Sequence, residues 1–448
     1  MSMDLWDYRK NFDYDRPLES GDPLRVDLNA ARGDYNRGRL LRELGVDLAK
    51  NELRHPRVAK CILFGGHRGC GKTTELRAVA NDLHNPKRFF VIHIDALKEL
   101  DVNNLNYADV ALAFAQLLAE KLVAEGIVVP DQYLSQLHEW FQQISRSQTF
   151  ESNLKAEIET GITAKLGLPF IGQMFARLKA SIRSNTTYKT EIREQVRNSI
   201  TALTEAFNTL HDYAQDALAE AGKGRAVIFI VDGTDRMRSD EAVTFFVSDI
   251  HQLRLLRTNC IYCAPINVLN EQGQVAQNFD AIFRLPMVKL TEKGMEQPID
   301  LALQCMRSFI DQRLPRENFD SPDTLDLLIK NSGGHPRDLL RLVNFCFQEL
   351  DQGPITHTVA QTAVRRLAND YKRLIKLDPD DFTVLVQIDK GDKTYTPATD
   401  QTRRLLYDLV LLEYNSYWWQ SHPAVRSLEG YVAATVSMKP PAGYVSGV

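Results

Sequence analysis

A glycine-rich stretch of eight residues is the part of this sequence whose residue types most clearly indicate chemistry. It runs from Gly66 to Thr73 and fits the pattern G-x-x-x-x-G-K-[ST], in which backbone N–H groups surround phosphates. Glycines permit that curled backbone, and the helix N-terminus that follows adds partial positive charge. In this pattern Lys72 would reach the β- and γ-phosphates, and the Thr73 hydroxyl would hold Mg²⁺. The predicted phosphate-binding residues are Gly66, His67, Arg68, Gly69, Cys70, Gly71, Lys72, Thr73 and Thr74.

A second candidate is Asp232, which ends the continuous apolar run 226–231. Such a β-branched run is typical of a parallel strand that is covered on both faces. Ligands of open α/β sheets bind outside the carboxyl ends of the strands, so Asp232 would lie at the same edge as the glycine-rich loop. We therefore predict that Thr73 and Asp232 are the residues associated with a Mg²⁺ ion.

The elements around these residues alternate between strand and helix patterns, which predicts a parallel α/β sheet. Before the loop, residues 58–64 contain a short apolar run, and residues 74–80 look like the first turns of a helix. The predicted strands are 58–64, 88–95, 226–232, 259–267 and 281–288.

The spacing of Lys72 and Asp232 predicts an insertion. They are 160 positions apart, whereas two crossovers and one strand need about 60 residues. The excess is residues 127–222, which carry helical patterns. Inside it, the apolar run 161–172 precedes Arg177, Lys179 and Arg183. Such a stretch can lie on a membrane or on nucleic acid. It can also pack on its own domain, and this is the interpretation that we favour.

The composition limits the classes of protein to consider. With 448 residues, 44% hydrophobic and 25% charged, the chain can form several globular domains. A net charge of −4 provides no global attraction to nucleic acid. No apolar run reaches 18 residues and no signal peptide begins the chain, so we expect a cytoplasmic protein without a transmembrane segment. Six scattered cysteines, including Cys260 and Cys263 within a predicted strand, indicate core packing rather than a disulfide framework.

Taken together, four features resemble the AAA+-like branch of P-loop ATPases, particularly its STAND and origin-recognition-like members. They are the loop at 66–73, the strand with Asp-Gly-x-Asp at 226–235, the strand ending at Asn267, and the segment Ser-Gly-Gly-His-Pro-Arg-Asp-Leu-Leu-Arg at 332–341. The resemblance implies an α/β fold, in which a P-loop NTPase parallel sheet is followed by a helical lid domain and a C-terminal winged-helix-like domain. It also implies ATP as the nucleotide, with Mg²⁺.

The same resemblance assigns further roles. Arg337 would reach the γ-phosphate from the lid, where an arginine makes a strong charge-assisted contact. Asn267 would orient the attacking water. Many members of this branch place Glu directly after the strand-ending Asp, but here Gly233 follows, and Asp235 is the available carboxylate. We therefore expect slow ATP hydrolysis, as in a nucleotide switch. No arginine finger is assigned; Arg254, Arg257 and Arg284 are candidates.

The predicted domains follow from these assignments. An arm, 1–55, contains a helical pattern over 36–53; it can pack beside the nucleotide base or wrap around the core. In the winged-helix-like unit a helix is expected over 399–413. The domains are the N-terminal arm 1–55, the P-loop NTPase core 56–290 with its insertion 127–222, the helical lid 291–376, the winged-helix-like domain 377–435 and the flexible tail 436–448.

These features lead to one main hypothesis and two alternatives. The main one is an ATPase switch that forms a homo-oligomer and regulates a protein partner (an effector), in a setting such as bacterial antiviral defence. The first alternative is a nucleic-acid-binding ATPase, of the loader or transposition-regulator type, that uses Arg403 and Arg404. The second is a membrane-acting ATPase that uses residues 161–183 for peripheral contact.

Overall fold

The computed structural model describes residues 5–146, 152–164, 166–184, 186–270, 272–350, 352–391, 399–415 and 418–437. The chain packs into two units, and each is built from segments that are far apart in sequence. Unit 1 comprises Met1–Asn36, Gly66–Arg77 and Arg284–Val448, and unit 2 comprises Arg37–Gly65 and Ala78–Phe283. No helix in the described ranges is long and apolar enough to cross a bilayer.

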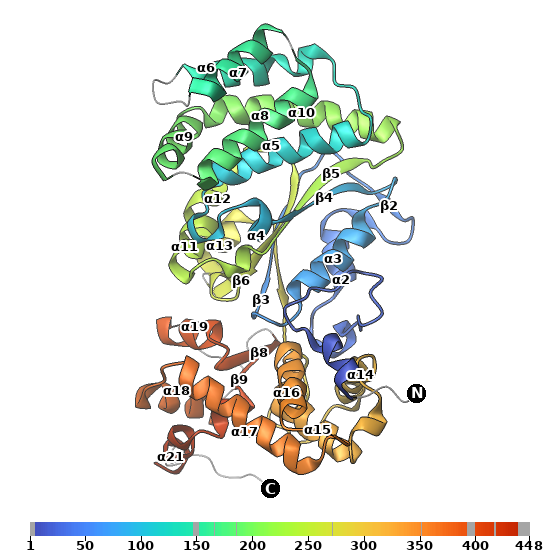
Figure 1. The fold of residues 1–448 in the computed structure, drawn as a ribbon, viewed down its shortest axis with the longest axis vertical. Helices are drawn as coiled ribbons and strands as arrows, with labels where there is room; N and C mark the ends of the chain where they lie inside the picture. Colours follow the sequence, from blue (N-terminus) through green and yellow to red (C-terminus); the bar gives the residue numbers. More distant parts are fainter. Residues whose placement is uncertain are drawn as a thin grey trace. The chain divides into compact units, whose positions relative to one another are not determined.

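A five-stranded sheet forms the centre of unit 2 and confirms the predicted α/β fold (Figure 1). Its strand order is β4-β5-β6-β3-β7, and β5 pairs in parallel with both β4 and β6. Asp232 and Asp95 end β5 and β4 at matching positions of this register. The strands are β3 (Cys61–Gly66), β4 (Phe89–Asp95), β5 (Ala226–Asp232), β6 (Asn259–Pro265) and β7 (Ala281–Leu285).

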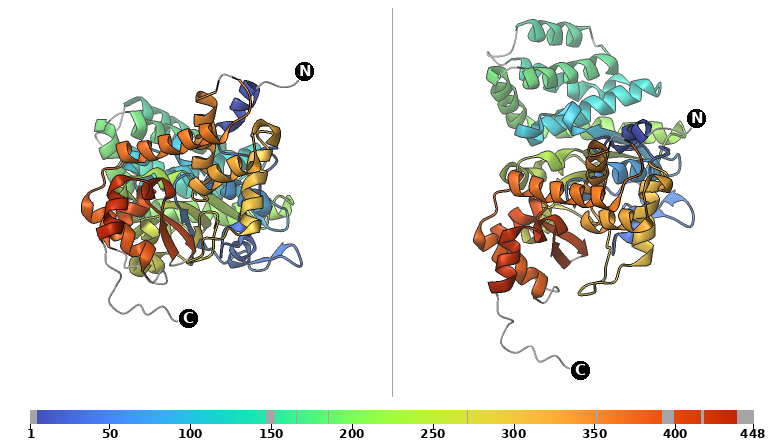
Figure 2. Two further views of the ribbon diagram at one scale, coloured as in Figure 1. Left: turned by 90° about the horizontal axis from the view of Figure 1, so that it is seen from below. Right: turned by 60° about the horizontal axis from the view of Figure 1, so that its bottom comes forward.

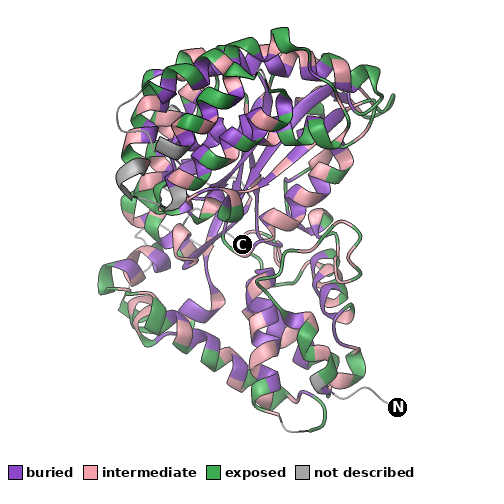
Figure 3. Ribbon diagram, turned by 45° about the horizontal axis from the view of Figure 1, so that its top comes forward, coloured by how far each residue is buried: buried purple, intermediate pink, exposed green. Residues whose placement is uncertain are grey.

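Burial explains why these segments form strands. Every residue of β3, β5 and β6 is buried, as expected for strands with helices on both faces, and these strands are purple in Figure 3. The longest connecting helix, α3 (Lys72–Leu83), is amphipathic: Leu76, Val79 and Leu83 are buried, whereas Asn81 is exposed. The other connecting helices are α4 (Ala96–Glu99), η3 (Val102–Asn104), α11 (Ser239–Val243), the π-helix η6 (Thr244–Asp249), α12 (Ile250–Leu253), η5 (Thr234–Arg236), η7 (Val268–Asn270) and α13 (Gln272–Asn278).

Between β4 and β5 the chain forms a stack of helices, seen at the top of the right-hand view in Figure 2. The hydrophobic core of this helical stack is continuous with the core of the sheet. The ring of Phe114 in the stack lies on the ring of Phe229 in β5, with the two centroids 4.0 Å apart. The helices are α5 (Tyr107–Ala124), η4 (Asp131–Tyr133), α6 (Ser135–Ser145), α7 (Ser152–Thr163), α8 (Leu168–Ser184), α9 (Thr186–Asn198) and α10 (Ile200–Glu220).

Most of the amphipathic stretch of this insertion lies in α8, and the apolar face of that helix is buried. Ile171 and Phe175 are fully buried in the core of unit 2. Arg177 pairs with Glu157, and Lys179 pairs with Glu99. The side chain of Arg183 lies outside the described residues. The packed interpretation of this stretch therefore agrees with the structure.

Two predicted helices are shorter than expected. The helix expected over 36–53 ends early: α2 spans Arg37–Glu43, Gly45 follows with φ +84°, and the chain then forms a hairpin of β1 (Val46–Asp47) and β2 (Glu52–Leu53). A glycine in this left-handed conformation is a common helix terminator. The helix expected over 399–413 also ends early, as α19 (Asp400–Tyr407), because Leu409 adopts φ +63°.

Unit 1 combines the N-terminal arm, the glycine-rich loop and the chain after β7. A helical group is followed by a smaller group with the antiparallel pair β8–β9, and α17 contacts α20 of that second group. The predicted tail begins inside α21, and residues 438–448 lie outside the described residues. The elements are α1 (Leu5–Tyr8), η1 (Arg9–Phe12), η2 (Asn29–Ala31), α14 (Asp300–Asp311), η8 (Arg316–Asn318), α15 (Pro322–Asn331), α16 (Pro336–Gln348), α17 (His357–Leu374), α18 (Pro379–Lys390), α19, β8 (Leu411–Asn415), β9 (Trp418–Ser421), α20 (Pro423–Arg426) and α21 (Glu429–Ser437).

Candidate functional site

The glycine-rich loop has the backbone conformation that its glycines predict. Gly69 has φ +79° and Gly71 has φ +102°. A Cβ atom on Gly69 would lie 2.5 Å from His335 Nε2 and 2.8 Å from Arg337 Cβ. Only glycine therefore fits at position 69, both for its backbone conformation and because the start of α16 packs against the loop.

Lys72 is held inside the loop. Its Nζ atom donates to the carbonyl oxygen of Gly66 at 2.9 Å and to that of His67 at 2.7 Å. The side chain is buried, so its charge lies in a region of low dielectric constant, where attraction to an anion is stronger than in water. Thr73 follows at the second position of α3 and is half-buried. The loop, its lysine and the helix N-terminus thus present concentrated positive charge.

A pocket lies beside the loop within unit 1. It encloses about 120 Å³ and is open to solvent on one side. Three segments form its walls: the loop, the N-terminal arm, and the helices α14 and α16. Its apolar wall consists of Leu18, Leu24, Val26, Leu28, Phe309, Pro336 and Leu340. A flat apolar group next to a polyanion suits these walls.

The charged side chains around this pocket favour an anionic ligand. Six cationic side chains line it, against three carboxylates: Lys10, Arg16, Arg25, Arg32, Arg313 and Arg337 against Asp13, Asp27 and Glu75. Burial lowers the pKa of Arg313 to about 10, which still leaves it charged at neutral pH. Arg337 pairs with Asp15 at 3.1 Å on the exposed part of the arm.

The N-terminal arm is bonded to the loop and to the start of α3. Arg32 is buried, and its guanidinium donates to the carbonyl oxygens of Cys70 and Pro286, both at 2.6 Å. Glu75 accepts hydrogen bonds from Asn29 at 3.1 Å and from the Tyr35 hydroxyl at 2.9 Å. The arm is therefore part of the site.

His67 connects the loop to the second group of unit 1. Its Nδ1 lies 3.1 Å from the Leu406 carbonyl, and its Nε2 accepts a hydrogen bond from the Glu413 N–H at 2.9 Å. The proton is therefore on Nδ1. Burial, together with repulsion from His335 and Lys72, holds the pKa of His67 well below its usual value, which keeps the ring neutral.

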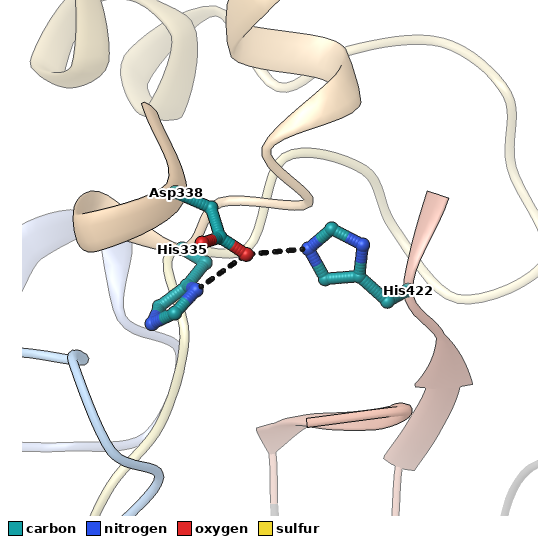
Figure 4. A group of neighbouring side chains, drawn as sticks. All are labelled: His335, Asp338 and His422. Atoms are coloured by element: carbon teal, nitrogen blue, oxygen red, sulfur yellow. Dashed lines mark ion pairs between the residues drawn. The ribbon is translucent and has the colours of Figure 1, made fainter. Parts of the chain in front are cut away.

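A buried carboxylate cluster lies directly behind the loop (Figure 4). Asp338 Oδ2 is 3.1 Å from His335 Nδ1 and 3.3 Å from His422 Nε2, and it accepts a hydrogen bond from the Tyr371 hydroxyl at 2.8 Å. Arg341 donates to the other carboxylate oxygen at 2.9 Å. Burial alone would raise the pKa of Asp338, but the attraction of His335 and the hydrogen bonds from both histidines hold it well below its usual value.

Two histidines and a carboxylate are also a set of metal ligands, but the hydrogen bonds around them indicate otherwise. The Ala424 N–H donates to His422 Nδ1 at 3.1 Å, so the single proton of this neutral ring lies on Nε2. That nitrogen faces Asp338 and has no lone pair for a metal ion. Burial lowers the pKa of His422, in agreement with a neutral ring. The cluster is an ionised Asp338 surrounded by donors.

The predicted carboxylates lie in unit 2. Asp232 is buried and its Oδ1 accepts a hydrogen bond from the Gly233 N–H at 2.8 Å. Ligand atoms of Asp232, Asp235 and Cys263 lie within 4.8 Å of one another. Asn267 follows the neighbouring strand; its amide donates to the Ser239 hydroxyl at 2.7 Å, and its buried Oδ1 has no hydrogen-bond partner among the described residues. The two carboxylates supply the oxygen ligands that Mg²⁺ prefers, whereas the cysteine sulfur does not suit it.

The predicted site residues therefore fall into two sets. Lys72, Thr73 and Arg337 lie in unit 1: Lys72 and Thr73 end the loop and begin α3, and Arg337 lines the pocket. Asp232, Asp235 and Asn267 lie in unit 2, at the carboxyl ends of β5 and β6. Their roles stay predictions. The sequence interpretation missed Arg32 and His335. The position of His335 two residues before Arg337 was a usable signal, but no local pattern marks Arg32.

Other arginines considered from the sequence have acidic partners. Arg254 lies 3.5 Å from Asp280, Arg257 3.4 Å from Asp212, and Arg284 3.1 Å from Glu413. In the second group of unit 1, Arg403 lies 3.0 Å from Asp400 and Arg404 lies 2.5 Å from Asp381.

Comparisons with known proteins give structural likenesses only. No family model and no curated protein matches the sequence. A Walker-type ATPase of Pyrococcus abyssi has 14% identity and a TM-score of 0.41, over 92% of this chain and 98% of that one. The ORC1 protein of Aeropyrum pernix, in complex with DNA, has 14% identity and a TM-score of 0.36, over 90% of this chain and 81% of that one. Cdc6p of Pyrobaculum aerophilum has 12% identity and a TM-score of 0.33, over 92% of this chain and 98% of that one. Because all TM-scores lie below 0.5, we base function on the residues of this chain.

Proposed function

We propose that this chain is an ATP-binding switch that hydrolyses ATP slowly in the presence of Mg²⁺. The observation that carries the proposal is the pocket of unit 1, where Gly69, Cys70 and Gly71 of the loop meet an apolar wall and an excess of cationic side chains. The polyphosphate would lie on the loop, and the base would lie against the apolar wall. ATP rather than GTP rests on the sequence resemblance.

The residues of this chain have distinct tasks in that reaction. Lys72 binds the β- and γ-phosphates and neutralises their charge. Thr73 and Asp232 would hold Mg²⁺, which supplies further charge neutralisation on the phosphates. Asp235 would accept a proton from the attacking water, which Asn267 would orient. Arg337 would exchange its partner Asp15 for the γ-phosphate.

The first test is nucleotide binding measured by isothermal titration calorimetry. Lys72→Ala should abolish ATP binding, because it removes the charge at the centre of the loop. Lys330→Ala is the matched control, since Lys330 is exposed on α15 of the same unit. Unchanged ATP affinity of the Lys72→Ala variant would refute the proposal.

We further propose that ATP controls self-assembly and thereby a protein partner, with antiviral defence as one possible setting. His67 supports this idea, because a residue of the nucleotide loop is bonded to Leu406 and Glu413 in the second group of unit 1. Light scattering coupled to size-exclusion chromatography, with ATP, with ADP and without nucleotide, tests it. Identical mass in all three states would refute nucleotide-controlled assembly.

The two alternatives have less support. For nucleic acid, Arg403 and Arg404 already have acidic partners, Asp400 and Asp381. For a membrane, the apolar side chains of α8 are buried within unit 2. Salt-dependent DNA binding that Arg403→Gln removes, or flotation of the chain with anionic liposomes, would restore the corresponding alternative.

A further inference from the structure

The glycine-rich loop has two carbonyl oxygens that accept hydrogen bonds from nitrogen atoms of side chains outside the motif. His335 Nε2 lies 2.9 Å from the carbonyl oxygen of Arg68. Arg32 Nη2 donates to the carbonyl oxygen of Cys70 at 2.6 Å. Both donors belong to unit 1, one at the start of α16 and one in the N-terminal arm. The loop is therefore supported from two sides.

These bonds orient the N–H groups of the next residues. In a planar trans peptide the C=O and N–H bonds point in opposite directions. A donor that binds the carbonyl of Arg68 therefore turns the N–H of Gly69 away from His335, and the Cys70 bond does the same for the N–H of Gly71. Among the backbone hydrogen bonds of the described residues, none has the N–H of Gly69 or Gly71 as its donor. Both glycines line the pocket.

The hydrogen-bond partners of His335 also define its protonation. A carbonyl oxygen only accepts, so Nε2 must carry a proton. Nδ1 lies 3.1 Å from Asp338 Oδ2. The proton on Nε2 makes His335 a hydrogen-bond donor to the loop backbone, and Asp338 lies on the other side of the ring. His67 and Lys72 of the loop and Arg337 beside it are further charged or titratable groups here, and Asp338 itself is surrounded by Arg341, Tyr371 and His422.

We propose that His335 and Arg32 are positioning residues of the nucleotide site, which hold the Gly69 and Gly71 N–H groups in place for the polyphosphate. This inference rests on the proposed function and deepens it. The two side chains act on the loop backbone and not on the base. Their loss should therefore weaken binding of the phosphates and leave binding of the nucleoside unchanged.

Calorimetric titration with ATP, inorganic tripolyphosphate and adenosine separates these contributions. We expect His335→Ala and Arg32→Ala each to weaken the binding of ATP and of tripolyphosphate by about tenfold, which corresponds to one lost hydrogen bond. Adenosine affinity should change by less than about threefold. His335→Gln keeps an N–H donor for the Arg68 carbonyl and should restore most of the loss. The controls are His357→Ala and Arg365→Ala, two exposed residues of α17.

Hydrogen exchange of the nucleotide-free protein tests the same inference without a ligand. Peptides that cover residues 66–73 should exchange faster in His335→Ala and Arg32→Ala than in the wild type and controls. Failure of the wild type to bind ATP would refute the proposed function, but exchange would still report on the support of the loop. Unchanged exchange, or wild-type ATP affinity in either alanine variant, would overturn the inference. So would a His335→Gln variant as weak as His335→Ala.

Discussion

Replacing Gly69 with alanine tests the packing of the loop most directly. Gly69 adopts φ +79°, a conformation that costs an L-residue about 1–2 kcal/mol. The new Cβ would also lie 2.5 Å from His335 Nε2 and 2.8 Å from Arg337 Cβ, and relieving such overlap costs about 1 kcal/mol or more. The loop conformation would therefore be disfavoured by roughly 2–3 kcal/mol, which lowers the competent fraction by about 30- to 150-fold.

The assay is calorimetric titration with ATP, with Gly353→Ala as the control. Gly353 has φ +87° in the same unit, but a Cβ atom there meets nothing within 4 Å. That variant has the backbone cost without the clash, and Gly353 does not line the pocket, so the variant should bind ATP as the wild type does. Wild-type affinity in Gly69→Ala would refute the reasoning. An equal loss of ATP affinity in both variants would show that the contact of Gly69 with His335 and Arg337 has no effect on ATP binding.

Three further results are expected. Asp232→Asn should bind ATP but lose Mg²⁺-dependent hydrolysis, measured as phosphate release; hydrolysis at the wild-type rate would remove Asp232 from the mechanism. Asp338→Asn should lower stability by about 3 kcal/mol at neutral pH, because it removes one partner of a buried ionic cluster. Since the pKa of Asp338 is depressed in the folded state, its contribution to stability is present above about pH 4 and is lost as the pH falls. The urea midpoints of variant and wild type should therefore converge in acid. A difference between the two midpoints that does not change with pH would contradict the ionised carboxylate. Of the six cysteines only Cys305 is partly exposed, and burial raises the pKa of Cys61 and Cys346 to about 12. A thiol reagent should therefore modify at most one thiol in the native protein and all six after unfolding.

Local signals predict the loop and the strands well. The four fixed positions of the motif and the apolar run before Asp232 are each contained in a few consecutive residues, and each has a direct physical reason for its conformation. Strand β5 is buried along its whole length, as that run indicates.

Other features depend on distant parts of the chain and leave no local trace. Arg32 binds the carbonyls of Cys70 and Pro286, which are 38 and 254 positions away. The helix expected over 399–413 is wrong because a continuous apolar run fits a helix and a buried strand equally well. Here Leu409 in a left-handed conformation ends α19, and β8 follows.

The segmental composition of unit 1 has a consequence for synthesis of the chain. Unit 2 is contained in residues 37–283, so it is complete before the last third of the chain has been made. Unit 1 cannot be completed until the segment that begins at Arg284 has been made, because Met1–Asn36 and the glycine-rich loop pack with that segment. Since domains fold as units in the order of their synthesis, we expect unit 2 to fold on the ribosome first. The pocket, walled by Arg32 from the first segment of unit 1 and Arg337 from its last, would then close after unit 2 has folded, and the proposed ATP binding would begin only at that point.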